Sequence, residues 1–348
     1  MILNLYFLLF LNDNEVSGMG KFVSIIIPVY NEQKYIKKCI ESLIKIEYPK
    51  NLLEIIFVDG MSCDDTRKII NEFIKKNNFI KLIDNEKKIA PIAMNLGIEA
   101  ARGDLIMRMD AHSSYPKDYV TKLVAWKEKL NAANVGAICK TDVVNKNKKS
   151  VAIIKVLSNK FGIGNGLFRI GVTEPTNVDT VPFGLYEKKL LKDIGGYDER
   201  LVRNQDIELN KRILNKGGKI FLVPNVYFTY YARENLKDFM KNNYSNGMWN
   251  VLTAKYTKNI KSLSLRHFIP LIFLLSLILP LLISIFYWKF IIISLLVLIV
   301  YLIVLSWVCI KIYDKDTTLI DLIMSFLALH FSYGVGSCVG ILKSLKVK

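Results

Sequence analysis

The sequence predicts an α/β protein with a doubly wound, mainly parallel sheet, followed by a C-terminal membrane helical region. Strand-length apolar runs alternate with amphipathic runs of helical length from residue 22 onward, as in repeated βαβ units. The chain has 348 residues, enough for two domains. Its hydrophobic residues, 51% of the total, are concentrated after residue 267, so a soluble part should precede a membrane part.

The first half of the chain alternates regularly between the two kinds of run. Continuous apolar runs predict buried strands at F-V-S-I-I-I-P-V (22–29), L-E-I-I-F-V-D (53–59), F-I-K-L-I (79–83) and D-L-I-M-R-M (104–109). Apolar residues at helical spacing predict helices at 34–46, 66–76 and 91–101. Helices between such strands favour a parallel sheet that is covered on both faces.

The middle of the chain is less regular. Residues 151–178 are rich in glycine, and we interpret them as a mobile loop near the site or a simple connector. A strand is expected at 178–187, an acidic helix start at 203–208, and a closing strand at 219–224.

The last third predicts membrane association. Residues 232–266 are basic and aromatic, which is typical of helices lying at a membrane surface. Two uncharged runs, 268–287 and 290–310, are each long enough to span a hydrocarbon core of about 30 Å. A third run, 319–342, contains Asp321 and His330, and it either spans or lies partly in the interface. The expected organisation is a short apolar segment at 1–21, a soluble domain at 22–231, interfacial helices at 232–266 and a transmembrane region at 267–348.

Residues 1–12 are apolar but too short to cross a bilayer, and they lack the basic start of a secretory signal. An interfacial anchor and an extended translation start remain as interpretations. The five cysteines include no C-x-x-C pair, which argues against a disulfide framework or a zinc site and favours a reducing compartment.

The formal net charge of +17 is compatible with nucleic acid, an anionic membrane leaflet or anionic substrates such as nucleotides as partners. The lysines are scattered through the predicted helices, so we interpret them as mostly solvated surface with a membrane-facing subset. No nucleic-acid recognition motif accompanies the charge, so we expect no nucleic-acid partner.

Acidic side chains follow three of the four predicted parallel strands. The first strand ends in P-V-Y-N-E (28–32), the second in D-G-M-S-C-D-D (59–65) and the fourth in D-A-H (110–112). Ligands of open α/β sheets bind at the carboxyl ends of the strands, so these residues are site candidates. Neither G-x-G-x-x-G nor the P-loop pattern is present, which excludes those two ways of holding phosphate.

Five stretches in this order resemble the signatures of family 2 glycosyltransferases with the GT-A fold. They are S-I-I-I-P-V-Y-N-E, F-V-D-G-M-S-C-D-D-T, A-P-I-A-M-N-L-G-I-E-A-A-R-G-D, M-R-M-D-A-H and R-N-Q-D-I-E-L, within residues 22–230. The D-A-H form, V-D-T-V-P-F-G and the late Y-S-N-G-M-W are similar to the succinoglycan-biosynthesis type of membrane glycosyltransferase. The resemblance implies a GT-A mixed sheet, a nucleotide-sugar donor, a divalent cation and inversion at the sugar carbon. The favoured donor is a UDP-sugar.

The resemblance also implies roles for individual residues. Asp110 and His112 match the metal-binding Asp-x-Asp of the family, and the histidine favours Mn²⁺ over Mg²⁺. Asp206 matches the catalytic base, with Glu208 as runner-up; a glutamine, Gln205, stands where the family has the first acid of a pair. The residues expected to contact the donor are Pro28, Tyr30, Asn31, Glu32, Asp59, Asn95, Gly97, Asp110 and, on donor or acceptor phosphate, Arg233.

Processive relatives carry Q-x-x-R-W before their spans, and this chain does not. We therefore expect one sugar transfer to a polyprenyl-diphosphate-linked acceptor in surface polysaccharide synthesis, by a multi-pass plasma-membrane protein with its catalytic domain in the cytoplasm. Two alternatives stay open: an enzyme that makes a polyprenyl-monophosphate sugar, and a membrane-tethered nucleotide-binding regulator without turnover. The presence of both Asp110 and Asp206 argues against the regulator.

Overall fold

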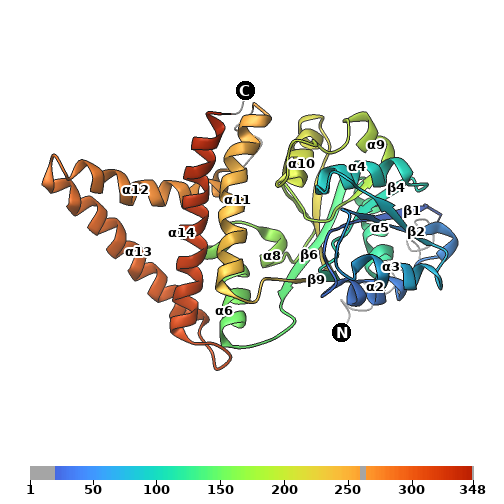
Figure 1. Cartoon of the computed structure of the whole chain (residues 1–348), viewed down its shortest axis with the longest axis horizontal. Coiled ribbons are helices and arrows are strands. Elements are labelled where there is room, and N and C mark those ends of the chain that lie inside the picture. Colours follow the sequence, from blue (N-terminus) through green and yellow to red (C-terminus); the bar gives the residue numbers. More distant parts are fainter. Residues whose placement is uncertain (1–19, 259–263, 347–348) are drawn as a thin grey trace. The chain divides into compact units, whose positions relative to one another are not determined.

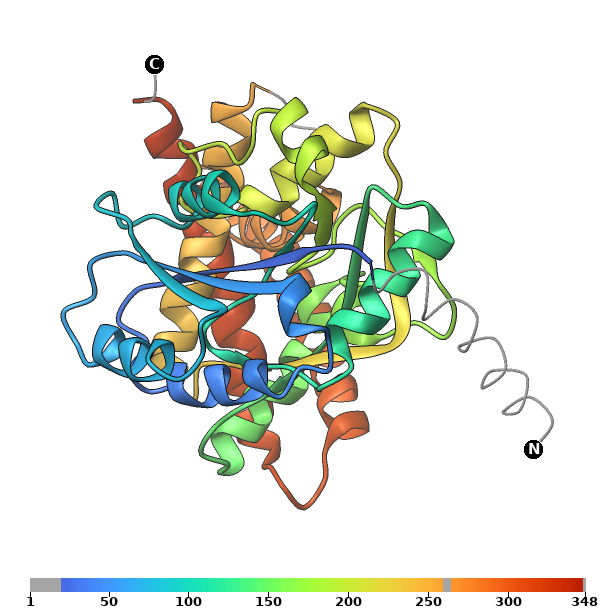
Figure 2. The same ribbon diagram turned by 90° about the vertical axis from the view of Figure 1, so that its right-hand side faces the viewer.

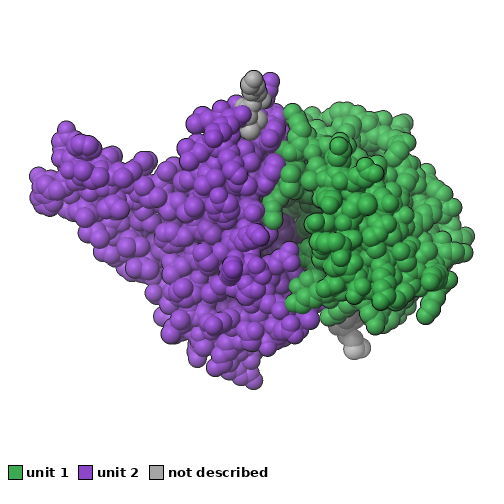
Figure 3. Space-filling model, viewed as in Figure 1, with its two compact units in different colours: residues 1–140, 171–230 green, residues 141–170, 231–348 purple. Residues whose placement is uncertain are grey.

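The computed structural model describes residues 20–258 and 264–346 (Figure 1). The chain divides into two compact units, one containing residues up to 140 together with 171–230, the other 141–170 together with 231 onward (Figure 3). Of the apolar segment expected at 1–21, residues 1–19 lie outside the described residues. The stretch 141–170 therefore belongs to the second unit although it lies in the middle of the sequence of the first.

The first unit is built on a mixed sheet. The described strands, nine in number, run in the order β3-β2-β1-β4-β8-β6-β9-β5, with β7 paired to β9. Strands β1 to β4 are parallel, whereas β8 is antiparallel to β4 and to β6. Their bounds are β1 Val23–Val29, β2 Leu53–Asp59, β3 Ile80–Asp84, β4 Leu105–Arg108, β5 Ser113–Ser114, β6 Asn134–Asp142, β7 Thr176–Asn177, β8 Leu185–Glu187 and β9 Ile220–Tyr231. The predicted α/β doubly wound mixed sheet is confirmed.

Helices cover both faces of this sheet, with α4 on one side and α2 and α3 on the other (Figures 1 and 2). Helix α2 buries Ile36, Cys39, Ile40 and Leu43, the spacing that places side chains on one helical face. The helices of the unit are α2 Ile36–Ile44, α3 Thr66–Ile74, α4 Ala90–Ala100, α5 Tyr119–Leu130, α9 Lys188–Asp193 and α10 Gln205–Asn215.

The second unit is helical. Its helices are α6 Lys148–Leu157, α7 Lys160–Ile163, α8 Leu167–Ile170, α11 Leu236–Tyr256, α12 Ile269–Ile283, α13 Ile291–Ile312 and α14 Leu319–Ser344. The mobile loop expected at 151–178 is wrong for the stretch that forms α6, α7 and α8. An Asn147 capping box begins α6, and Ala152, Ile153 and Val156 are buried at helical spacing.

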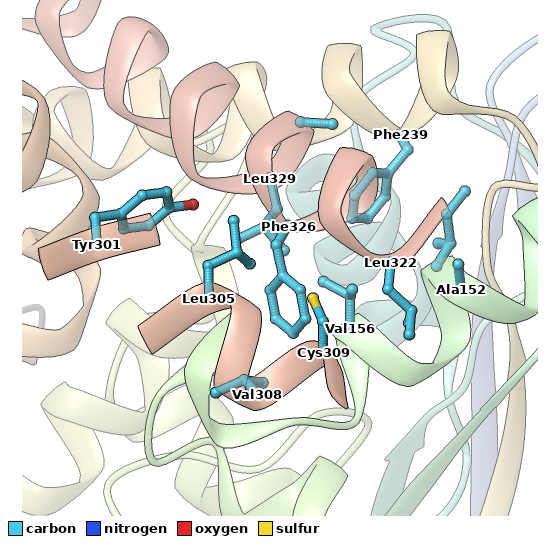
Figure 4. Close-up of a cluster of buried hydrophobic side chains, with 12 residues drawn as sticks. Ala152, Val156, Phe239, Tyr301, Leu305, Val308, Cys309, Leu322, Phe326 and Leu329 are labelled. Atoms are coloured by element: carbon cyan, nitrogen blue, oxygen red, sulfur yellow. The ribbon is translucent and has the colours of Figure 1, made fainter. Parts of the chain in front are cut away.

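These α6 side chains belong to a hydrophobic cluster shared with α13 and α14. Figure 4 shows Val156 beside Leu305, Cys309 and Phe326. The cluster explains why the stretch 141–170 belongs to the second unit: its apolar face is covered by α13 and α14 together with Phe239 of α11.

Helices α11 and α14 pack closely in parallel. Gly336 leaves no room for a Cβ beside the Tyr244 carbonyl, and a Cβ on Gly340 would lie 2.6 Å from the Met248 carbonyl oxygen. Ser337 Oγ donates a hydrogen bond of 3.2 Å to the Gly247 carbonyl. Small residues therefore bring the two backbones together, as they do wherever helices approach closely.

Two described helices are long and apolar enough to cross a membrane, Trp288–Ile312 and Leu319–Ser344. Helix α12 is a shorter apolar helix of 15 residues and ends at Ile283, before the end of the span expected at 268–287. Within the expected interfacial region, residues 236–256 form one continuous helix, α11.

Candidate functional site

The loops that follow β1 and β2 are joined by hydrogen bonds from three side chains. Asn31 N donates to Ser62 Oγ (2.9 Å), and Asn31 Oδ1 accepts from Cys63 N (2.9 Å). Glu32 N donates to Thr66 Oγ1 at 2.7 Å. Asn31 adopts a positive φ of 54°, which asparagine tolerates better than most residues. The two loops therefore form one ordered edge at the carboxyl ends of β1 and β2.

Asp59 stabilises this loop edge through hydrogen bonds. Its side chain is fully buried, and it accepts hydrogen bonds from Ser62 Oγ (2.5 Å), Ser62 N (3.0 Å) and the NH1 of Arg67 (2.6 Å). Arg67 also pairs with Asp84 at the end of β3 (2.7 Å). Asp59 thus stands at the predicted place, but in this structure it shapes the loop and holds Arg67, a residue that the motifs did not single out.

Tyr30 forms the exposed rim above Asp59. A Cβ on Gly60 would lie 3.2 Å from Tyr30 Cδ2 and 3.3 Å from Lys88 Cα, so only glycine fits there without displacement. Lys88 Nζ lies 5.9 Å from the Tyr30 ring centroid. Pro28 lies within β1, where the missing N–H is tolerated because pairing with β4 ends at Ile26.

Asp110, His112 and Glu32 form a compact group at the ends of β4 and β1. The imidazole Nδ1 of His112 lies 2.8 Å from Asp110 Oδ1 and 3.4 Å from Glu32 Oε1. The His112 ring also meets Tyr230 edge to face, with centroids 5.0 Å apart. The structure therefore brings Asp110 and His112 together, and their role as cation ligands stays a prediction.

Charge coupling dominates the ionisation of this group. Burial disfavours the charged form of His112, but Asp110, Tyr230 and Glu32 outweigh burial and raise the pKa of His112 well above its usual value. Burial likewise opposes ionisation of Asp110, yet His112 and then Arg108 lower the pKa of that carboxyl. Both shifts favour the charged forms of His112 and Asp110.

Arg108 connects this group to the opposite side of the site. Its NH1 lies 3.1 Å from Oδ2 of Asp206 in the first turn of α10, and its side chain is buried. Burial lowers its pKa, but the charges of Asp206, Tyr197 and Asp110 together raise it above the ordinary value. Sequence reasoning missed Arg108; the available signal was a charged residue inside an apolar strand, which is rare unless the charge is paired.

Glu208, the runner-up base, is already engaged. Its two carboxylate oxygens accept from Nε and NH2 of Arg212, both at 2.7 Å, and the side chain is buried. Arg212 donates further to the carbonyls of Ile194 and Gly196. Glu208 therefore secures the loop before α10, whereas Asp206 is partly exposed.

Asn95 and Gly97 have structural contacts in α4. Asn95 Nδ2 donates to the Tyr197 carbonyl and to Glu199 Oε1, both at 2.9 Å, and its Oδ1 accepts from Tyr197 N at 2.8 Å. Gly97 packs against the Ile26 side chain with no room for a Cβ. Contact of either residue with a diphosphate stays a prediction. Arg233 belongs to the second unit, and its role also stays a prediction.

The side chains of Asp110, His112 and Glu32 are of the types that bind a divalent cation. Two carboxylates and an imidazole are ligands that Mn²⁺ accepts, and they lie within a few ångströms of one another. Within the described residues no group of three such side chains is already arranged around a vacant ion position. The raised pKa of His112 favours its protonated form. Because a histidine binds a metal ion only after it loses that proton, a cation would have to displace the proton from His112.

The sheet order and the polar strand ends place the first unit in the class of proteins with the GT-A fold. The mannosyltransferase PcManGT from Pyrobaculum calidifontis, solved with GDP-mannose and Mn²⁺, matches 93% of this chain and 87% of its own with a TM-score of 0.58. The identity is 13%, so this likeness shows the fold alone.

Sequence comparison identifies the family. The profile of glycosyl transferase family 2 matches residues 24–195. The dolichyl N-acetyl-α-D-glucosaminyl phosphate 3-β-D-2,3-diacetamido-2,3-dideoxy-β-D-glucuronosyltransferase of Methanococcus voltae is 35% identical over 236 residues, 65% of this chain and 72% of the relative. The succinoglycan biosynthesis protein ExoA of Rhizobium meliloti is 28% identical over 65% of this chain and 67% of its own length. The chain belongs to glycosyl transferase family 2, and both predicted resemblances are confirmed.

Proposed function

We propose that the protein transfers one sugar from a nucleotide-sugar donor to a lipid-linked saccharide, with inversion at the sugar carbon. Among nucleotide sugars, a UDP-sugar is the favoured donor. The observation that carries the proposal is the ion pair between Arg108 and Asp206. It connects the candidate base on α10 with the acidic group at the end of β4, since Arg108 also interacts with Asp110. Base and donor-side residues thus form one electrostatic network in the first unit.

Asp206 is the proposed base. As the acceptor oxygen bonds to the sugar carbon, the bond from that carbon to the donor phosphate oxygen breaks and the nucleoside diphosphate leaves. The acceptor hydroxyl proton passes to the Asp206 carboxylate. Asp206 is partly exposed, so an acceptor can reach it, and the Arg108 guanidinium lies 3.1 Å from one of its carboxylate oxygens.

Asp110 and His112 are the proposed cation ligands, with Glu32 adjacent. A bound divalent cation, Mn²⁺ in preference to Mg²⁺, would neutralise charge on the leaving diphosphate. The loop edge formed by Tyr30, Asn31 and Asp59 is proposed to hold the nucleoside. It is ordered by hydrogen bonds within the loops, so binding the donor would require little rearrangement.

The acceptor proposal is supported by the relatives and by the helical unit. The name of the M. voltae relative describes action on a dolichyl-linked sugar phosphate, and ExoA is named for succinoglycan biosynthesis. The apolar helices of the second unit suit a protein that works on lipid-linked substrates at a membrane. We place it in the plasma membrane as a multi-pass protein with the catalytic unit in the cytoplasm.

The test uses the full chain purified in detergent with Mn²⁺ and a panel of nucleotide sugars. Acceptors are polyprenyl-diphosphate sugars, polyprenyl-monophosphate sugars and unglycosylated polyprenyl phosphate. A new glycosidic bond on a lipid-linked sugar is expected. Product formed only on bare polyprenyl phosphate would instead establish a lipid-monophosphate sugar synthase. Donor binding without turnover on any acceptor would establish a regulator.

A further inference from the structure

Helices α12 and α13 form a hairpin whose surface is apolar almost throughout. Lys289 is the only charged residue between His267 and Lys311. Large apolar side chains are exposed along both helices and at the turn, where Phe286 is 83% exposed. In a single molecule in water this surface would be far larger than the apolar patches that soluble monomers show.

Helices α13 and α14 are both long and apolar enough to span a membrane, but they differ in how much of each is buried inside the protein. Within the most apolar 18-residue stretch of each helix, 22% of α13 is buried inside the protein, against 56% of α14. What covers α14 is chiefly α11, through the close backbone contacts at Gly247, Gly336 and Gly340.

That partner cannot enter hydrocarbon with α14. Helix α11 carries Lys237, Asp238 and Lys241 near its start and Lys255 near its end, and four asparagines lie between them, Asn242, Asn243, Asn246 and Asn250. Charged and amide side chains are both disfavoured in the hydrocarbon of a bilayer. Because α11 runs in parallel with α14 over the shared contacts, a span formed by α14 would bring this polar helix into the membrane beside it.

The arrangement within the second unit gives a consistent alternative. Helix α12 runs crosswise to the α11–α14 pair, and α13 slants from the tip of the hairpin back toward the start of α14 (Figure 1); the perpendicular view shows α12 nearly end-on while α14 runs vertically (Figure 2). A bilayer crossed along the direction of α12 would therefore have α14 running along its surface.

Lengths and residue placement agree with a crossing hairpin. Helix α13 has 22 residues, about 33 Å, and α12 has 15 residues, about 22 Å, which the turn at 284–287 extends. Tyr287, Trp288 and Lys289 lie at the tip, where amphipathic side chains can reach the far headgroups. Arg266, Lys311 and Lys315 lie at the base, as expected for the side facing an anionic leaflet.

We infer that, among the described helices, only the α12–α13 hairpin crosses the lipid bilayer, and that α14 lies outside the hydrocarbon with its C-terminal end on the same side as the hairpin base. The occupant of the apolar hairpin surface is the bilayer core. This inference does not depend on the transfer reaction proposed above, so either can fail without the other.

Labelling of introduced cysteines with a membrane-impermeant maleimide tests the topology. In a Cys63→Ser, Cys338→Ser background, which keeps only the three buried cysteines, the variants are Lys289→Cys at the tip, Lys315→Cys at the base and Lys346→Cys beyond α14. The reference is a Cys338→Ser protein, which retains the exposed Cys63. Lys315→Cys and Lys346→Cys should label from the side on which Cys63 labels, and Lys289→Cys only from the other side. Labelling of Lys346→Cys from the tip side would show that α14 crosses. Labelling of Lys289→Cys from the Cys63 side, or from neither side, would show that the hairpin does not cross.

A matched pair of valines tests which helix contacts hydrocarbon. Val300 on α13 is 59% exposed and Val335 on α14 is 44% exposed. Val300→Glu should reduce the carbonate-resistant membrane fraction by about tenfold or more, and Val335→Glu should leave it nearly unchanged. Circular dichroism and protease resistance in detergent check that both variants fold. Equal losses for the two variants would overturn the inference, as would a wild-type protein that is soluble without detergent as an oligomer, because a second copy would then cover the hairpin.

Discussion

Arg108 NH1 lies 3.1 Å from Asp206 Oδ2, joining strand β4 to the first turn of helix α10 within the first unit. The guanidinium is buried, and its CZ lies 5.6 Å from the centroid of the Phe183 ring. A buried arginine is stable only when its charge is matched, and here Asp206 is the nearest anion. We therefore expect Arg108 to affect the reaction by positioning Asp206, the proposed base, and not by contacting the substrate itself.

Replacing Arg108 should reduce turnover more than donor binding. Arg108→Met removes the cation that orients Asp206, and we expect kcat to fall by about 100-fold or more, in the range typical of misplaced acid–base groups. Steady-state kinetics and donor titration calorimetry would measure the two effects. Arg108→Lys should recover part of kcat. Arg200→Met, which removes an exposed pair with Asp198, is the control and should leave kcat unchanged. An unaltered kcat in Arg108→Met would contradict the positioning role.

Substitutions should distinguish the roles of Asp206 and Glu208. Asp206→Asn should lower kcat by about 10³-fold or more while the donor Kd changes little, because only the proton acceptor is lost. Glu208→Gln should mainly lower the melting temperature, since it breaks the bidentate pair with Arg212. If Asp206→Asn still transfers sugar, or if Glu208→Gln alone abolishes transfer in a folded protein, the base assignment is wrong.

His112→Asp should keep activity and change the metal preference. A carboxylate at this position restores an all-oxygen ligand set, which suits Mg²⁺ better than a set containing imidazole. The measurement is the ratio of initial rates with Mg²⁺ and with Mn²⁺, which should rise in the variant. Direct Mn²⁺ binding, followed by electron paramagnetic resonance without donor, provides a readout besides turnover. An inactive variant with unchanged Mn²⁺ binding would count against His112 as a ligand.

Glu54 should make folding stability depend on pH in the acid range. Burial opposes its ionisation, but hydrogen bonds from Ser24, Arg102 and Lys81 lower the pKa of Glu54 to about 2 from an ordinary value of 4.5. Because the folded pKa is the lower one, the stabilisation is complete above about pH 4.5 and is lost as the pH falls toward 2. A shift of this size corresponds to roughly 3 kcal/mol.

Thermal unfolding between pH 6 and pH 3 would show the effect as a falling melting temperature. Glu54→Gln should flatten that part of the profile and lower stability at pH 6. Glu99→Gln, at an exposed pair with Lys192, is the matched control and should behave as wild type. A Glu54→Gln profile as steep as that of wild type would contradict the assignment.

The sequence predicted the parallel half of the sheet because four buried strands and their helices are local features of period and length. Asp110 and His112 could be placed because they directly follow such a strand. Arg108 could not be singled out, since its partner Asp206 is distant in the chain and only folding brings them together. The two contacts of Asn95 with the Tyr197 backbone are hidden in the same way by a separation of 102 residues.

Elsewhere the local signal was ambiguous or misleading. Glycines at 162, 164 and 166 suggested a loop, and Gly164 and Gly166 do separate α7 from α8. The break between α6 and α7 falls at Ser158 and Asn159 instead, and the apolar face of α6 is covered by α13 and α14, more than 140 residues later. Glu208 lies four residues before Arg212 on the same helix, so the spacing itself indicated this pair, whereas Asp206 lies six residues before Arg212 and is not its neighbour on the helix surface.

The division of the second unit between residues 141–170 and 231 onward has a consequence for synthesis. Ile153 and Val156 leave the ribosome well before Leu305 and Phe326, which cover them in the finished protein. At about 5–20 residues per second, translation leaves this apolar face uncovered for on the order of ten seconds. A gene fragment that ends near residue 231 would leave it uncovered permanently, so such a catalytic fragment should aggregate unless α6 is replaced or its apolar face is made polar.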